Sequence, residues 1–147
     1  MTVRLAGPPE DLAVPAIDTG LLLERARGVL RALGHARSEL SLTLTDDAGI
    51  AELNQQYRAR RGPTDVLSFS LFEGDHADHR GGLLGDVVIG VEAAARQARA
   101  AHRGLDRELA HLLIHGVLHL LGHDHEADDE ARRMRAEERR LRRALSL

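Results

Sequence analysis

The sequence predicts a small α/β (α+β) fold, with helices packed on a sheet of three or four strands. Segments of helical periodicity and segments of strand-like alternation are mixed through the 147 residues, which argues against an all-α or all-β chain. No internal repeat and no long linker divides the sequence, and a chain of this length forms one domain by default. We therefore expect a single domain over residues 1–147.

The first elements follow from composition and periodicity. A short strand at 2–5 precedes a loop at 6–19 that is rich in Pro, Gly and Asp. Apolar residues at helical spacing predict a helix over 21–33, and Gly34 supplies its stop. Strict alternation over 39–45 predicts a half-buried strand.

The middle of the chain contains a helix, a basic turn and a second strand. Asp46 or Asp47 can cap a helix that carries Tyr57 near its end. Residues 58–63, with the sequence RARRGP, form a basic turn. An apolar strand is expected at 65–71.

The second half is mainly helical. A polar loop at 73–82 leads to a β-branched strand at 84–90 that is bounded by Gly. Three helices are then expected, at 91–102, at 105–121 and, with a charged surface, at 126–145.

Composition excludes several classes of protein. Without Cys there is no disulfide framework, no thiolate zinc site and no Cys nucleophile, so a metal would be bound by His, Asp or Glu. All 20 basic residues are Arg and the net charge is −3, so a site for a polyanion would be local. The N-terminus resembles no targeting segment, and the apolar run at 112–121 is interrupted by His115 and His119. We expect a soluble, cytoplasmic protein with no membrane partner.

A histidine cluster is the strongest chemical signal. Five of the nine His lie within 15 residues, at His111, His115, His119, His123 and His125. On a helix, residues four apart share one face about 5–6 Å apart, so His115 and His119 can bind one ion. Gly122 should end the helix and let His125 come round as a third ligand. Because each buried imidazole nitrogen needs a partner, a shared metal is favoured over packing alone.

The ligand set favours one Zn²⁺ per chain. Three imidazoles with one open position are typical of catalytic zinc. Three neutral ligands leave the ion's +2 charge uncompensated, which lowers the pKa of bound water towards ~7 and favours an anionic substrate such as a phosphodiester. His111, one turn earlier, is expected to pack or to support the ligands, and His123 and Asp124 to orient His125 or transfer protons.

A metallopeptidase is the alternative enzyme. Peptidases with the H-E-x-x-H motif carry a general-base Glu directly after the first His, and this chain has Gly116 there. Glycine costs about 1 kcal/mol of helix propensity, so either a neighbour packs closely against it or the local packing merely tolerates it.

Five short segments occur in an order that is typical of one known family. They are LNQQYR at 53–58, PTDVLSFS at 63–70, LGDVVIG at 84–90, HGVLHLLGHDH at 115–125 and an acidic stretch that ends at Met134. Together they cover roughly residues 39–145 and resemble the YbeY-type endoribonucleases. The family most often has Tyr where this chain has His123, which leaves His123 as an alternative ligand or proton donor.

The resemblance implies an activity and a site. Single-stranded RNA would be cut hydrolytically in bacterial 16S rRNA 3′-end maturation and ribosome quality control, with a metal-binding helix beside a mixed sheet. His115, His119 and His125 would bind zinc, with His115 also catalytic. Arg58 would line the groove and clamp the scissile phosphate, although an ordinary surface ion pair is the alternative.

The resemblance also implies partners. They would be ribosomal RNA and the small ribosomal subunit with its proteins, and DNA is not expected. A non-catalytic ribosome-assembly factor with a structural metal is the rival from another class. The general base stays open between Asp124, Asp86 and metal-bound hydroxide.

Three further features favour ordinary roles. The loop at 73–82 contains two His and two Asp, yet a polar loop of this kind usually faces water. The Arg-rich stretch at 132–143, with Glu137 and Glu138 interleaved, is typical of a solvated helix face. Only three aromatic residues occur in the chain, so RNA would be held mainly through its phosphates.

Overall fold

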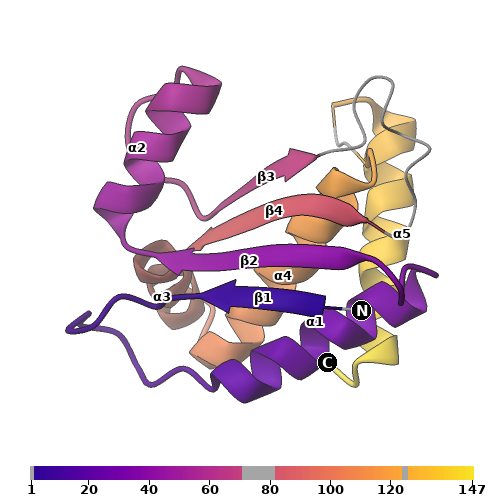
Figure 1. Cartoon of the computed structure of the whole chain (residues 1–147), viewed down its shortest axis with the longest axis horizontal. Helices are drawn as coiled ribbons and strands as arrows, with labels where there is room; N and C mark the ends of the chain where they lie inside the picture. Colours follow the sequence, from indigo (N-terminus) through magenta and orange to yellow (C-terminus); the bar gives the residue numbers. More distant parts are fainter. Residues whose placement is uncertain (1, 71–81, 124–125) are drawn as a thin grey trace.

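The computed structural model describes residues 2–70, 82–123 and 126–147. These residues form four strands and five helices (Figure 1). In chain order they are β1 (Thr2–Ala6), α1 (Thr19–Ala32), β2 (Glu39–Thr45), α2 (Asp47–Arg58), β3 (Val66–Ser70), β4 (Leu83–Gly90), α3 (Val91–Ala100), α4 (Leu105–Leu120) and α5 (Asp128–Ala144).

The four strands form one mixed sheet in the order β1-β2-β4-β3. The β1, β2 and β4 strands are parallel, and β3 runs antiparallel to β4 at the end of the described sheet. The predicted α/β class and the mixed sheet are confirmed. The order of the strands could not be predicted, because β4 inserts between β2 and β3.

The larger core lies on one face of the sheet. The alternation over 39–45 holds, with Leu40, Leu42 and Leu44 fully buried. They join one apolar cluster with residues of α1, α3, α4 and α5, so these helices cover this face. We call it the α4 face, because α4 contacts both β3 and β4 there.

A smaller cluster lies on the opposite face, where α2 packs. Ile50 of α2 contacts Leu67 of β3 and Val88 of β4. In Figure 1, α2 stands apart from the helices of the larger core. The turn after α2 leads from this face into β3, the last strand of the described sheet, and its arginines line a cavity together with residues of β3.

The observed ends of the elements differ from the predicted ones by a few residues. The first helix begins at Thr19 rather than 21, because the side chain of Asp18 accepts a hydrogen bond from the Leu21 amide and caps it. The helix predicted over 91–102 ends at Ala100, since His102 adopts a left-handed conformation with φ 55°. Asp46, rather than Asp47, is the cap of α2.

Most of the predicted loop at 73–82 falls outside the described residues. Among the helices that are described, none is both long and apolar enough to span a membrane.

Candidate active site

Helix α4 presents the two central histidines and ends where the sequence predicts. Its last turn is closed by two hydrogen bonds, from the Gly122 amide to the His119 carbonyl and from the His123 amide to the Leu118 carbonyl. Gly122 has φ 92°, which only glycine adopts readily. This pair of bonds with a left-handed glycine is a Schellman turn. The chain therefore reverses immediately after His119.

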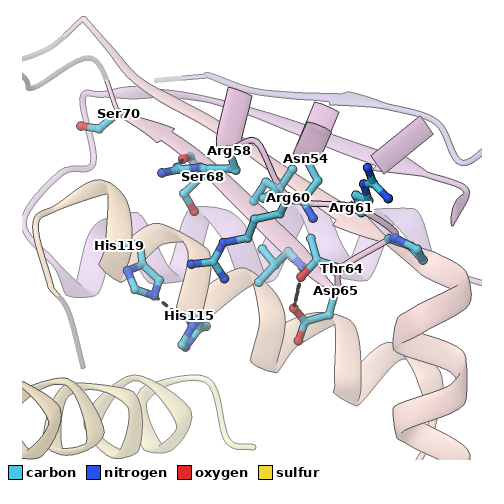
Figure 2. Close-up of a pocket in the computed structure, with 13 residues that line it drawn as sticks. Asn54, Arg58, Arg60, Arg61, Thr64, Asp65, Ser68, Ser70, His115 and His119 are labelled. Atoms are coloured by element: carbon cyan, nitrogen blue, oxygen red, sulfur yellow. Dashed lines mark hydrogen bonds between the residues drawn. The ribbon is translucent and has the colours of Figure 1, made fainter. Parts of the chain in front are cut away.

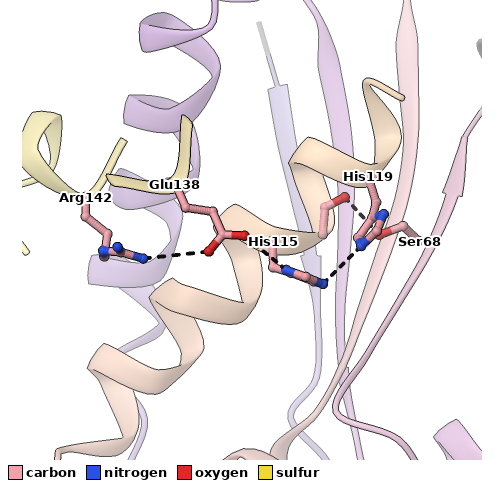
Figure 3. Close-up of polar contacts among 6 residues, drawn as sticks. Ser68, His115, His119, Glu138 and Arg142 are labelled. Carbon is pink, nitrogen blue, oxygen red and sulfur yellow. Dashed lines mark hydrogen bonds and ion pairs between the residues drawn. The ribbon is translucent and has the colours of Figure 1, made fainter. Parts of the chain in front are cut away.

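The two histidines of α4 face each other. The Nε2 atoms of His115 and His119 lie 3.0 Å apart, and the ring centroids 4.5 Å apart (Figure 3). Two nitrogens bound to one tetrahedral zinc ion at their usual bond lengths are about 3.3 Å apart. The helix thus brings two imidazole nitrogens close to the separation that zinc requires, as the spacing of four residues predicts.

Glu138 of α5 fixes the orientation of His115. Its Oε1 lies 3.4 Å from His115 Nδ1, and its other oxygen lies 3.7 Å from Arg142, so the three side chains form a row (Figure 3). The hydrogen bond from His115 lowers the pKa of the Glu138 carboxyl, while burial opposes this shift. An ionised carboxylate can only accept, so in this contact Nδ1 of His115 is the donor and Nε2 is the atom that faces His119.

His111 lies one turn before His115 and is a buried base. Burial lowers its pKa, and Arg103, Arg142 and Arg107 lower it further. Within the described residues, its Nε2 atom is buried without a hydrogen-bond partner. His111 is therefore neutral near pH 7, which agrees with a packing or supporting role.

Gly116 is a contact point between α4 and the sheet. A Cβ atom there would lie 2.7 Å from Cγ1 of Val87 and 3.2 Å from Cγ2 of Val66. The hydroxyl of Ser68 donates to the Gly116 carbonyl at 2.8 Å. Of the two readings of this glycine, close packing is confirmed. A glutamate, as in the H-E-x-x-H motif, has no room at this position.

A cavity of about 570 Å³ opens beside the histidine pair (Figure 2). His115 and His119 lie on one side, and β3 and the turn after α2 form the other. The arginines that line it are Arg58, Arg60 and Arg61. A cavity that combines two imidazoles with several guanidinium groups suits an anionic substrate.

Arg58 and Arg60 point in different directions at the cavity. The Nη2 atom of Arg58 donates to the Ser68 carbonyl at 2.5 Å, and its guanidinium carbon lies 5.6 Å from the centre of the Phe69 ring. The side chain of Arg60 instead extends into the cavity towards the histidine pair (Figure 2). Arg58 lines the cavity as predicted, and its guanidinium also contacts β3.

The candidates for the general base and for additional metal ligands lie in different parts of the structure. His123 lines a different, smaller cavity with Glu130 and Arg133. Asp86 pairs in register with Phe69, and its neighbour Val87 faces Gly116, so alternation places Asp86 on the face opposite α4. His125 and Asp124 lie outside the described residues.

Two residues of the site were not predicted from the sequence. Arg60 was treated only as part of a basic turn, and Glu138 as part of a solvated helix face. A signal for Glu138 does exist: it lies four residues after Met134 and three before Leu141, which are the buried residues of α5. Helical spacing thus places this acid on the inner face of α5, where an unpaired carboxylate would be unfavourable.

The donors agree with a metal site that is incomplete in the described part of the chain. Among those residues, no group of three or more His, Cys, Asp or Glu could hold an ion. His115 and His119 supply two nitrogens with the chemistry that zinc requires and close to the separation that it requires. Gly122 ends α4 three residues after His119. The third predicted ligand, His125, follows Gly122 by three residues.

Comparisons with known proteins agree with the fold and the site. The sequence model described as "Endoribonuclease YbeY" matches residues 19–146. The endoribonuclease YbeY of Pelotomaculum thermopropionicum is 45% identical, with 100% of this chain and 99% of that protein covered. The Geobacter sulfurreducens protein of the same name is 44% identical over 85% of each chain. The solution structure of TM1509 from Thermotoga maritima superposes with a TM-score of 0.64 at 27% identity, covering 97% of this chain and 88% of that one.

The fold and the site together define a small α/β protein with an arginine-lined cavity beside a pair of facing imidazoles. The chain belongs to the endoribonuclease YbeY family.

Proposed function

We propose that this chain is a zinc-dependent endoribonuclease that cuts single-stranded RNA, acting in the cytoplasm on the 3′ end of 16S rRNA in ribosome maturation and quality control. Ribosomal RNA and the small ribosomal subunit with its proteins would be its partners. The observation that carries the proposal is the facing Nε2 pair of His115 and His119 at 3.0 Å, beside a cavity lined by arginines, in a member of this family.

His115, His119 and His125 would hold the zinc ion. When bound, Zn²⁺ would supply a Lewis acid for the phosphodiester and for water. Glu138 would keep His115 in the tautomer that presents Nε2, and the stacked turns of α4 would keep both rings on one side of the helix.

The arginines would position the substrate. A guanidinium offers several N–H donors in one plane, which match two oxygens of a phosphate. Arg58 uses one Nη2 donor on the Ser68 carbonyl, so the remaining donors of this fixed group can contact a phosphate at the edge of the cavity. Arg60, which extends towards the histidines, would contact the scissile phosphate and balance charge in the transition state.

Two other functions have less support. The metallopeptidase alternative lacks the general-base glutamate, and the contacts of Gly116 with Val87 and Val66 leave no room for one. An assembly factor with a structural metal would normally provide four protein ligands. It would also not need arginines that extend into an open cavity.

The test compares the cleavage of RNA with the cleavage of an unstructured protein by the purified chain. A short single-stranded RNA should be cut, its duplex should be resistant, and an unstructured protein should stay intact. A chelator should abolish the cleavage and added Zn²⁺ should restore it. His119→Ala should be inactive, whereas the exposed control His102→Asn, which tolerates the left-handed backbone, should match the wild type.

Each other outcome identifies a different function. Cleavage of the unstructured protein instead of RNA would support the peptidase. Cleavage of neither substrate, with metal required for folding and with co-sedimentation with ribosomes, would support the assembly factor. RNA cleavage that persists in a chelator would refute the zinc dependence but leave the nuclease.

A further inference from the structure

Tyr57 is an exposed aromatic residue at the end of α2. Its side chain is 59% exposed, and of the described residues only Leu83 is another large apolar side chain of this kind. Tyr57 follows the buried residues of α2, Ile50 and Asn54, and is not part of either apolar cluster. Burial in the folded chain therefore does not explain why an aromatic ring stands here.

Tyr57 and Phe69 form an aromatic pair. Their ring centroids are 5.3 Å apart with an interplanar angle of 68°, so the rings meet edge to face. Phe69 is on β3, on the face of the sheet opposite α4, and it is partly exposed. An edge-to-face contact leaves ring surface uncovered, as the exposure of Tyr57 shows.

The aromatic pair lies directly beside the cavity with the histidines. Arg58 is the link, because it lines the cavity and its guanidinium carbon lies 5.6 Å from the Phe69 ring centre. The Arg58 guanidinium thus lies over the Phe69 ring, between the aromatic pair and the cavity. Arg60 and Arg61 continue the positive charge along the cavity wall.

An exposed aromatic ring next to arginines has the chemistry that binds unpaired nucleotides. The arginines attract the phosphates, and the ring offers a flat apolar surface on which a base can stack. A base in a duplex is already stacked and paired, so it cannot use such a surface without being unpaired.

We propose that the exposed ring of Tyr57, held edge to face by Phe69, is a stacking subsite for an unpaired RNA base, one that neighbours the phosphate held in the cavity. This inference rests on the proposed function, since it supplies a second contact with the same RNA. It gives a physical reason for a preference for single strands. It also adds a base contact to the expectation that RNA is held mainly through its phosphates: aromatic residues are few, but two of the three lie together at the edge of the site.

The composition of the chain provides a direct probe. Tyr57 is the only Tyr, and there is no Trp, so the intrinsic emission excited in the Tyr band reports on Tyr57 alone. The His119→Ala variant, which is expected to bind RNA without cutting it, should be titrated with a short single-stranded RNA. Stacking should quench the emission, whereas the same RNA without bases or paired in a duplex should leave it nearly unchanged.

Substitutions of Tyr57 distinguish two roles of its ring, stacking on an RNA base and covering Phe69. In the wild-type background, Tyr57→Phe keeps an aromatic ring, while Tyr57→Leu keeps an apolar cover without one. Loss of stacking should weaken RNA binding and raise KM roughly 5- to 100-fold in Tyr57→Leu, with kcat little changed and Tyr57→Phe close to wild type. The matched control is Leu83→Ala, which removes the other exposed apolar side chain and should leave RNA binding unchanged.

The outcomes separate this inference from the proposed function. Binding of labelled RNA without a change in Tyr57 emission, with Tyr57→Leu binding as tightly as the wild type, would overturn the stacking subsite while the nuclease stands. Equal losses in Tyr57→Leu and Tyr57→Phe would also overturn it, because they would indicate a role of the hydroxyl. If RNA is neither bound nor cut, the proposed function fails and this inference fails with it.

Discussion

Replacing Glu138 with Gln should weaken zinc binding without unfolding the protein. Glu138 contacts His115 Nδ1 through one oxygen and is only 22% exposed, so its charge acts on His115 with little screening by solvent. Glutamine has nearly the same shape and keeps an oxygen acceptor, but it loses the negative charge. It can also rotate its amide group towards His115 and favour the wrong tautomer.

The size of the effect follows from the kind of contact. Removing the partner that orients a metal-bound histidine typically costs 10- to 100-fold in metal affinity, which is about 1.4–2.7 kcal/mol. The contact of 3.4 Å is longer than an ideal hydrogen bond, so we expect a value near the lower end of this range. Glu138→Ala should reduce the zinc affinity further, because Arg142 would also lose its ion-pair partner at 3.7 Å.

The assay is competition for Zn²⁺ with a coloured chelator, with the thermal midpoint measured on the same samples. The matched control is Glu137→Gln, the adjacent residue of α5, whose carboxylate pairs with Arg140 at 2.7 Å on the surface. A second readout needs no metal: nitrogen NMR shifts of the apo protein should show His115 protonated at Nδ1 in the wild type and a mixture of tautomers in Glu138→Gln.

The reasoning would be refuted if Glu138→Gln bound zinc as tightly as Glu137→Gln and kept the wild-type tautomer of His115. A loss of zinc affinity that followed a large drop in thermal midpoint would instead show that Glu138 acts by holding α5 against α4. Glu138→Ala, measured in the same way, separates the two cases, since a purely structural role predicts parallel losses of stability and affinity.

Two further predictions concern stability. Gly116→Ala gains about 1 kcal/mol of helix propensity but places its Cβ 2.7 Å from Val87, and such overpacking costs about 1–3 kcal/mol, so we expect a lower thermal midpoint. Adding Val87→Ala to this variant should restore the midpoint, and a midpoint above wild type for Gly116→Ala alone would contradict the contact. His111 has a lowered pKa, so the unfolded chain takes up a proton that the folded chain does not, and stability should fall as the pH drops below about 6.5. Urea unfolding at about pH 8 and about pH 5.5 should show this fall in the wild type and a smaller one in His111→Gln; equal falls would rule out His111 as a cause.

The elements with strong local signals could be predicted from the sequence. The alternation over 39–45 gave β2 with its bounds, and the periodicity before Gly122 gave α4 to within one residue. Local signals do not specify which strands are neighbours. The insertion of β4 between β2 and β3 depends on packing between distant segments, and it determines that Asp86 faces away from α4 while Ser68 faces towards it.

Some residues of the site could be predicted from local spacing, and others could not because they depend on packing between distant segments. The facing pair of His115 and His119 follows from a spacing of four residues on one helix, which is local. The contact of Glu138 with His115 joins two helices, and the approach of Arg60 to the cavity depends on a turn on the other side of β3. Their residue types were visible in the sequence, but only the packing of α5 and β3 against α4 assigns them to the site.

The hydrogen bond from Arg58 to the Ser68 carbonyl has a consequence for self-association. β3 is the last strand of the described sheet, and its outer main-chain groups could pair with a strand from a second molecule. The guanidinium of Arg58 occupies one of these acceptors with a bulky, charged group. An Arg58→Ala variant would therefore uncover part of a sheet edge while it removes a charge from the cavity. Loss of activity in such a variant has to be compared with its sedimentation behaviour before it is assigned to catalysis.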